Sequence, residues 1–244
     1  ETRQVLQRLA QGVVTADLEY HENEVLTARG ERRLVAWHNT VLCDAAGRCG
    51  GLLCSGEDIT ERRRAEALVQ LNEARLESLW RISQYRAAST QDLLDYALQE
   101  ALALTGSSVG YIYHYQEEER RFILSTWSKE VSRECSIAEA LQVYELDKTG
   151  IWGEAVRQRR PILVNDFQAP NPLKKGYPPG HVELYRYLTI PVFDQERIVA
   201  VVGVANKPSD YDDADARQLT LLMDAVWRIV ERQEAEEALR VSER

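Results

Sequence analysis

A charged stretch divides this sequence into two parts that each contain predicted strands and turns. From Glu61 to Arg86 there is no glycine or proline, and charged residues are dense. Strands are enriched in β-branched and aromatic residues and are bounded by turn residues. This stretch has few of the former and none of the Gly or Pro that mark turns, so it predicts a helix. We therefore expect a small N-terminal part over residues 1–60, a helical linker over 61–87, a larger domain over 88–232 and an exit helix over 233–244.

The linker carries a narrow, weakly apolar seam. Residues at spacings of three and four along it are Leu68, Asn72, Arg75, Leu79, Ile82 and Arg86. Polar side chains within such a seam are typical of a coiled coil, where they fix the register at a cost in stability. The pattern favours a linker that pairs with a second copy in a parallel dimer. The alternative is a helix folded back on its own domain.

The exit helix resembles the linker. Ile59 to Ala67 and Ile229 to Glu237 have similar charged sequences, as expected for modules joined by helical connectors. The final helix, which starts at about Asp213 and continues into the exit helix, also has a more apolar heptad seam, formed by Leu219, Leu222, Val226 and Ile229. We interpret this seam as a second candidate dimer contact.

The N-terminal part predicts three antiparallel strands. They fall within Val14–Leu26, at Leu34–Leu42 and at Gly50–Cys54, with a turn at Asp44–Gly47, and a short helix around Val5–Ala10 precedes them. About 50 residues without disulfides or metals lie near the lower limit of independent folding. We expect another domain or chain to cover this sheet.

The larger domain predicts an α+β fold with a central antiparallel sheet flanked by helices. The expected elements are a helix at 92–104, strands at 109–116 and 122–127, a helix at 150–158, strands at 161–165, 187–193 and 198–205, and a helix from Asp213. A segment from Asp166 to Val182 holds four prolines and has neither strand nor helix periodicity. Loops of this length are usually functional or disordered.

The charge balance argues against nucleic acid as a partner. The chain has 30 Lys and Arg against 39 Asp and Glu, for a net charge of −9, the wrong sign for neutralising phosphates. No stretch approaches the roughly 20 apolar residues of a membrane span. We expect a cytoplasmic fragment without membrane contact, whose parent could be membrane-attached elsewhere. The sequence starts at Glu1 and its only methionine is Met223, which indicates a piece of a longer protein.

The cysteines predict neither a metal site nor a disulfide framework. Cys43, Cys49 and Cys54 lie close together near His38, but their spacings do not match zinc-binding patterns. We expect reduced thiols. Catalytic signatures such as a Walker loop, G-x-S-x-G or H-E-x-x-H do not occur in the sequence, so we expect no enzyme activity from this fragment.

Two resemblances follow from these residues. Gly30-Glu31-Arg32, the turn Asp44–Gly47 and the close Gly56-Glu57-Asp58-Ile59-Thr60-Glu61-Arg62 resemble the C-terminal half of a PAS sensor domain. Residues 88–232 resemble a GAF domain of bacterial signalling proteins, through the run Asn206 to Asp215. The resemblance assigns Asn206, Lys207, Tyr211 and Asp215 to a structural signature, in which Lys207 and Asp215 pair and hold a loop.

The GAF resemblance also implies a ligand pocket between the sheet and a lid. Candidate ligand-binding residues around the long loop are Tyr113, Trp127, Cys135, Trp152, Asn165, Asp166, His181 and Arg186. A purely structural interpretation stays open, in which the tryptophans belong to the core and Asp166 caps a turn. The ligand could be a cyclic nucleotide or another small metabolite. A covalent bilin is disfavoured, because Cys135 has no neighbouring His.

These resemblances predict a sensory and regulatory fragment of a two-component or cyclase signalling protein. The GAF domain would bind a small molecule and relay the signal through a parallel homodimer of helices to a histidine kinase or diguanylate cyclase output. The alternative is a ligand-free scaffold that serves dimerisation or interaction.

Overall fold

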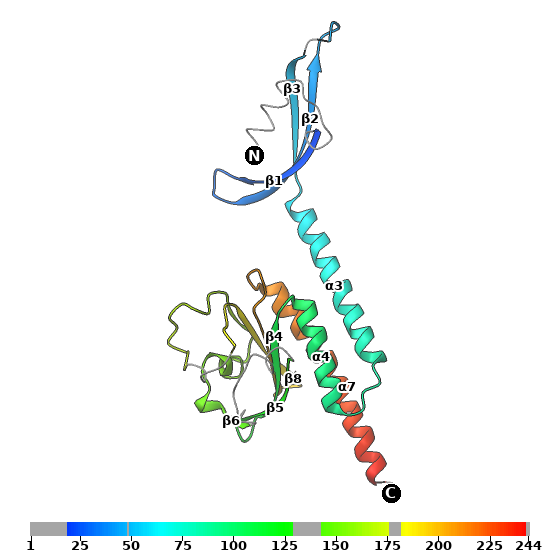
Figure 1. The fold of residues 1–244 in the computed structure, drawn as a ribbon, viewed down its shortest axis with the longest axis vertical. Helices are drawn as coiled ribbons and strands as arrows, with labels where there is room; N and C mark the ends of the chain where they lie inside the picture. Colours follow the sequence, from blue (N-terminus) through cyan, green and yellow to red (C-terminus); the bar gives the residue numbers. More distant parts are fainter. Residues whose placement is uncertain (1–18, 48, 129–142, 176–181, 243–244) are drawn as a thin grey trace. The chain divides into compact units, whose positions relative to one another are not determined.

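The computed structural model describes residues 19–47, 49–128, 143–175 and 182–242 (Figure 1). The chain forms two compact units, residues 1–70 and residues 71–244. The short helix expected around Val5–Ala10 lies outside the described residues.

The first unit contains a three-stranded antiparallel sheet in the order β1 (Tyr20–Leu26), β2 (Arg32–Cys43), β3 (Cys49–Asp58). Helix α3 (Thr60–Gln84) follows directly. Asp58 Oδ1 accepts a hydrogen bond from the Thr60 amide at 3.0 Å, and Thr60 Oγ1 accepts one from the Leu34 amide at 2.8 Å. Asp58 therefore binds an amide at the start of the helix, as capping side chains do, and Thr60 ties this start to strand β2.

The cysteines of this unit differ from the expectation of reduced thiols. Cys43, at the end of β2, is disulfide-bonded, whereas Cys54 is a free and exposed thiol. The expectation was wrong for Cys43, because sequence spacing alone does not show which cysteines a strand register brings together.

The second unit is built on a six-stranded antiparallel sheet in the order β6-β5-β4-β9-β8-β7. Its strands are β4 (Val109–Gln116), β5 (Arg121–Trp127), β6 (Val143–Glu145), β7 (Ile162–Val164), β8 (Tyr187–Asp194) and β9 (Arg197–Ala205). The predicted α+β fold with a central antiparallel sheet is confirmed. Strand β6 was not predicted, since a run of three residues carries no readable alternation.

Helices α4 (Thr90–Thr105) and α7 (Asp213–Ser242) cover one face of this sheet (Figure 1). Ser89 caps α4 by accepting a bond from the Asp92 amide at 3.1 Å. Gly106 ends the helix with φ of 63°, a left-handed conformation that glycine adopts without a steric penalty. The core under these helices is aliphatic, with Leu98, Val202 and Leu222 among its fully buried members.

The other face is covered by short elements. They are the 3₁₀ turns η1 (Leu146–Lys148) and η2 (Ile151–Gly153), the helix α6 (Glu154–Arg157) and the segment that follows β7. The predicted helix over 150–158 is thus split into a 3₁₀ turn and a single α-turn. Arg157 holds these turns by donating to the carbonyls of Leu146, Thr149 and Gly150 at 2.5, 2.9 and 3.2 Å.

The apolar seam of the exit helix is part of this domain's own core. Leu219, Leu222 and Val226 are fully buried, and Ile229 packs against the same cluster. Our interpretation of the seam as a dimer contact was wrong. An α-helix that packs on a sheet and one that pairs with another helix share the same spacing of three and four.

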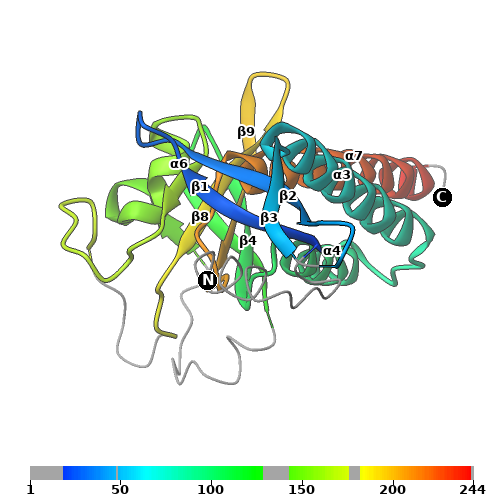
Figure 2. The same cartoon turned by 90° about the horizontal axis from the view of Figure 1, so that it is seen from above.

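The C-terminal half of α3 belongs to the second unit and packs beside α4 and α7 (Figure 2). Ile82 is buried in the core, and Asn72 Oδ1 accepts a bond from Gln218 Nε2 of α7 at 2.9 Å. Arg81 binds Glu100 of α4 through Nε–Oε1 at 3.0 Å and Nη2–Oε2 at 2.7 Å. For residues 71–84 the structure shows the folded-back alternative, and pairing with a second copy stays a prediction.

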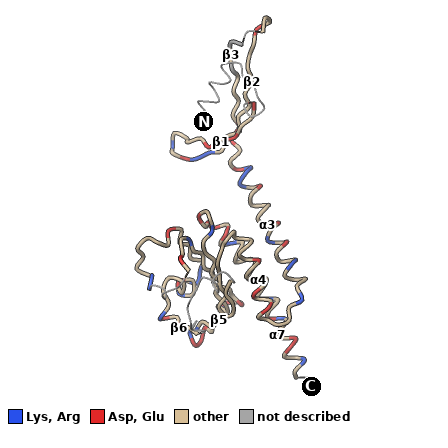
Figure 3. Tube along the Cα trace, viewed as in Figure 1, with Lys and Arg blue, Asp and Glu red and all other residues tan. Residues whose placement is uncertain are grey.

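Charged side chains are spread along α3 and the last turns of α7, while the strands of the six-stranded sheet carry few (Figure 3). On α3, Leu76 and Trp80 are nonetheless 58% and 64% exposed. No helix in the described part of the chain combines the length and apolar character needed to cross a bilayer.

Candidate functional site

Strand β4 divides its side chains between two different environments. Successive residues of a strand point to opposite faces. Tyr113 and Tyr115 belong to the aromatic cluster on the face away from α4 and α7, with Tyr111 packed against it. Ile112 lies in the aliphatic core, and the His114 ring stacks on Trp227 of α7 at 5.9 Å. The face that carries the tyrosines is therefore the candidate site.

Trp152 of η2 lies at the centre of this aromatic face. Its ring centroid is 4.7 Å from that of Phe122, 5.4 Å from Tyr113, 5.5 Å from Tyr144 and 6.3 Å from Tyr111. Edge-to-face and tilted pairs at these distances add about 0.5–1.5 kcal/mol beyond the area that they bury. We call Tyr111, Tyr113, Phe122, Tyr144 and Trp152 the Trp152 cluster.

Buried hydroxyl groups line one side of the Trp152 cluster. The Tyr111 hydroxyl lies 2.5 Å from that of Tyr187 on β8 and 3.5 Å from Thr189 Oγ1. Burial raises the pKa of Tyr111 to about 12, and burial also raises the pKa of Tyr187 well above its ordinary value. These phenols are therefore neutral at physiological pH and can exchange hydrogen bonds in a dry environment.

The position of Tyr111 depends on a glycine on the neighbouring strand. Tyr111 is directly opposite Gly203 of β9 in the register. A Cβ atom at residue 203 would lie 2.3–2.6 Å from the Tyr111 ring. Only glycine leaves room for this ring to lie flat across β9 and reach Tyr187 on β8.

Three of the predicted ligand-binding residues lie together. Tyr113 and Trp152 are in the Trp152 cluster, and Trp127 packs with Trp152 against the adjoining apolar cluster that contains Phe167. Burial is the main cause that raises the pKa of Tyr113. Cys135 and His181 lie outside the described residues.

The other predicted residues bind the backbone or, for Arg186, an acidic side chain. Asn165 is paired with the backbone of Tyr211 through two bonds of 2.8 Å. Asp166 Oδ1 accepts from the amides of Gln168 and Ala169 at 3.2 and 3.0 Å, as in an Asx turn. Arg186 Nε donates to Asp210 at 2.9 Å. These side chains fasten the segment after β7 and do not contribute to the Trp152 cluster.

The signature residues fasten the start of α7. Lys207 Nζ lies 2.6 and 2.7 Å from the two carboxylate oxygens of Asp215, whose side chain is only 7% exposed. Tyr211 lies 2.6 Å from Ser107 through the two hydroxyls. Asn206 has φ of 62° and binds the backbone of Glu183 and Tyr185 at 2.8 and 2.9 Å. Together these bonds join the ends of β9, α4 and the segment before β8.

Sequence reasoning missed Tyr111, Phe122, Tyr144 and Tyr187 as members of the aromatic face. A signal for part of this set is present, because Tyr111, Tyr113 and Tyr115 alternate on one strand. Tyr187 could not be found in this way, since its proximity depends on the strand order β4-β9-β8. Within the described ranges, no three His, Cys, Asp or Glu residues form a group that could hold a metal ion.

This domain has the α+β architecture. Helices cover one face of its antiparallel sheet, and short turns and loops cover the other. The GAF domain family matches residues 87–231, and the chain belongs to this family. The PAS fold matches residues 1–64, so a PAS-like region precedes the GAF domain.

The chain is also similar to a much longer protein. The methyl sulfide methyltransferase-associated sensor of Methanosarcina acetivorans is 51% identical over 183 residues, which are 75% of this chain and 18% of that protein. The chain thus spans under a fifth of the length of that relative.

Solved structures show the same fold at low sequence identity. The GAF domain of a phosphoenolpyruvate-protein phosphotransferase from Coxiella burnetii has a TM-score of 0.57 and 10% identity, over 70% of this chain and 98% of that one. Free methionine-R-sulfoxide reductase from Neisseria meningitidis, in complex with its substrate, has a TM-score of 0.51 and 14% identity, over 69% and 93%. At these identities the comparisons show the fold alone.

Proposed function

We propose that this chain is the sensory part of a signal-transduction protein, in which the GAF domain binds a small molecule at the Trp152 cluster. The sensory role is supported by the 51% identity to a protein named as a sensor and by the PAS-like region before the GAF domain. The observation that carries the binding site is the aromatic face itself, on which neutral phenol hydroxyls adjoin a central indole.

The chemistry of the cluster favours a flat ligand without charge. Its five members carry aromatic rings and no ionised group, and stacking on Trp and Tyr rings selects planar molecules. Buried phenols offer both donors and acceptors, so a ring bearing a carbonyl or amide group suits them. Among small metabolites this favours a heterocycle over a cyclic nucleotide, whose phosphate would need a positive partner.

The same groups favour binding over catalysis. Phenols with pKa values raised by burial are poor nucleophiles and poor bases at neutral pH, so the Trp152 cluster is suited to recognition. A histidine kinase or diguanylate cyclase output, outside this sequence, would supply the enzymatic step in our proposal. We also propose that this part acts in the cytoplasm, without binding nucleic acid or membrane.

A ligand screen tests the binding site. Cyclic nucleotides, haem and small heterocyclic metabolites are added to the chain, and the midpoint of thermal unfolding is followed. We expect a dose-dependent rise for one flat ligand in the parent chain and in Trp80→Phe, an exposed tryptophan on α3. Trp152→Phe should weaken that response at least tenfold. Equal responses in both variants would place the ligand elsewhere, and silence across the panel favours the ligand-free scaffold.

The relay to an output is proposed to use parallel dimer helices. Leu76 and Trp80 lie one turn apart on α3 and are exposed, whereas Ile82 of the same helix is buried in the core of this unit. Large exposed apolar side chains of this kind are typical centres of an interface. A ligand then shifts the relay only if it binds two arrangements of the dimer with different affinity.

Light scattering across a concentration series tests the dimer. We expect the parent chain to dimerise and Trp80→Ser with Leu76→Ser to remain monomeric, with an unchanged circular dichroism spectrum. Leu239→Ser, an exposed residue near the end of α7, is the matched control. A monomeric parent at high concentration would refute this mechanism.

A further inference from the structure

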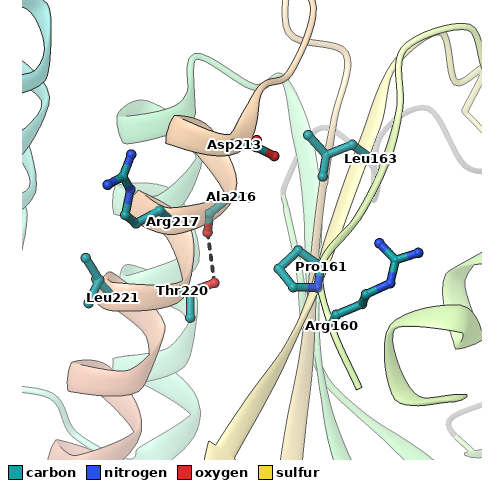
Figure 4. A pocket seen from close by; sticks show the side chains of 8 residues that line it. All are labelled: Arg160, Pro161, Leu163, Asp213, Ala216, Arg217, Thr220 and Leu221. Atoms are coloured by element: carbon teal, nitrogen blue, oxygen red, sulfur yellow. Dashed lines mark hydrogen bonds between the residues drawn. The ribbon is translucent and has the colours of Figure 1, made fainter. Parts of the chain in front are cut away.

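Two threonine hydroxyls of the GAF domain differ in how they are hydrogen-bonded. Thr220 lines a groove between β7 and the first turns of α7, and its Oγ1 donates to the Ala216 carbonyl at 2.8 Å (Figure 4). Thr189 of β8 is fully buried, and its Oγ1 is 3.5 Å from the Tyr111 hydroxyl. Bonds between hydroxyls are usually about 2.7–2.8 Å long. Among the described residues, the Thr189 hydroxyl therefore has no acceptor at an ordinary distance.

Thr189 lies in a row of residues that crosses the sheet on its aromatic face. Gly203 of β9 is opposite Tyr111 of β4 on one side and opposite Thr189 of β8 on the other. Because Gly203 has no side chain, the Tyr111 ring occupies the space beside it and brings its hydroxyl to β8. The Thr189 hydroxyl is therefore at the border of the Trp152 cluster, next to one of its rings.

The neighbouring phenols do not compensate this hydroxyl. The Tyr111 hydroxyl pairs with that of Tyr187 at 2.5 Å, which is a much shorter contact than the one to Thr189. A buried donor without a good acceptor destabilises a folded protein, whereas an apolar group of the same shape does not. In the free protein the Thr189 hydroxyl is thus a source of instability that an acceptor atom of a ligand would remove.

We propose that Thr189 determines which ligands the Trp152 cluster accepts, an inference that rests on the binding site proposed above. Its hydroxyl donates a hydrogen bond to a ring nitrogen or carbonyl oxygen at the edge of a flat, uncharged ligand. A flat ligand whose edge offers only an N–H group leaves the Thr189 proton unpaired and binds more weakly. An ionised acceptor is disfavoured, because its desolvation needs a charged partner.

Two flat bicyclic probes of similar size test this selectivity on the whole chain. Quinoline carries a ring nitrogen that accepts, indole carries an N–H group that donates, and both are uncharged at neutral pH. In calorimetric titrations we expect quinoline to bind about three- to tenfold more tightly than indole, which corresponds to one net hydrogen bond. In Thr189→Val the two affinities should become equal. Trp152→Phe should weaken both probes by the same factor.

The stability of the free chain gives a second readout. Thr189→Val should raise the midpoint of thermal unfolding of the GAF domain by about 2–4 °C, since it removes the unpaired donor and keeps the shape. Thr220→Val is the matched control, because the hydroxyl that it removes already has its acceptor. This control should not raise the midpoint and should leave the preference for quinoline unchanged. A Thr189 that only supported the fold would give a lower midpoint in Thr189→Val and an equal weakening of both probes.

Four results would overturn the inference. They are a lower midpoint for Thr189→Val, a preference for quinoline that persists in this variant, binding of indole as tight as that of quinoline in the parent chain, and no saturable binding of either probe. Failure of the proposed site is distinguishable from these. Equal binding of the two probes that Trp152→Phe weakens would overturn only the role of Thr189, whereas probe binding that Trp152→Phe leaves unchanged would place the site elsewhere.

Discussion

The two faces of the six-stranded sheet are built from different chemistry. The face under α4 and α7 is aliphatic, with Leu98, Val202 and Leu222 fully buried. The opposite face is aromatic, with Trp152 among tyrosines, of which Tyr111 pairs its hydroxyl with that of Tyr187. Aliphatic side chains pack densely without directional demands, whereas phenols and indoles keep a polar group that needs a partner.

This difference separates stability from recognition within one domain. The aliphatic face is covered by long helices, whose packing stays closed in the folded state. The aromatic face is closed by short turns and loops, which open at lower cost than a packed helix. We therefore expect substitutions on the aliphatic face to affect folding most, and those on the aromatic face to affect ligand response at a smaller cost in stability.

The largest effect is expected at Leu222. Leu222→Ala should lower the free energy of unfolding by about 3 kcal/mol, since a buried leucine loses its transfer free energy and leaves a cavity. The neighbouring Leu221 is 43% exposed, whereas Leu222 is fully buried. Leu221→Ala is thus the control and should cost less than about 0.5 kcal/mol in urea unfolding. Similar costs for the two would contradict the assignment of Leu222 to the core.

The second effect concerns the aromatic face. Gly203→Ala should cost about 2 kcal/mol, because the new methyl group and the Tyr111 ring cannot occupy the same space. In a Tyr111→Ala background this cost should largely disappear. A double-mutant cycle in urea measures the coupling. Additive costs would show that the strand, and not the Tyr111 ring, requires glycine.

A smaller effect is expected for a single hydroxyl. Tyr111→Phe removes the partner of the Tyr187 hydroxyl and should cost about 1 kcal/mol, the usual net value of one hydrogen bond. Tyr185→Phe, which removes an exposed hydroxyl bonded to Glu183, is the control for a hydrogen bond in contact with water. If Tyr111→Phe were neutral, the hydroxyl pair would not hold the aromatic face together.

The smallest effect is a dependence on pH from the aliphatic face. Burial lowers the pKa of His114 below its ordinary value of 6.5, although Glu234 acts in the opposite direction. The unfolded chain therefore binds more protons than the folded one just below pH 6.5. The contribution of neutral His114 is complete above pH 6.5 and is lost as the pH falls through the lowered pKa.

Urea midpoints at pH 7.5 and 5.5 measure this contribution. His114→Gln should lose less stability than the parent over this range, because its side chain does not titrate. Parallel losses in the two proteins would show that other groups account for the pH dependence.

The positions of helices and strands were predicted from the sequence more accurately than the contacts between them. Val109–Gln116 and the helix start at Asp213 are correct to the residue, because alternation and turn chemistry are local signals. The seam of α7 was misassigned, since a helix pattern shows which side is apolar but not what covers it. The aromatic face was found only in part, because it joins residues from separate strands and from η2.

The contact of α3 with its own domain contains uncompensated polar atoms. In the described part of the chain, Nε and Nη1 of Arg75 and Oε1 of Gln218 are buried without a hydrogen-bond partner. Buried groups in this state cost about 1–3 kcal/mol each, which weakens the attachment of residues 71–84. Amide hydrogens of this half of α3 should therefore exchange with deuterium earlier than those of α4, through local opening that leaves the sheet folded. Residues 71–84 of α3 are then the first part of this domain to detach from it.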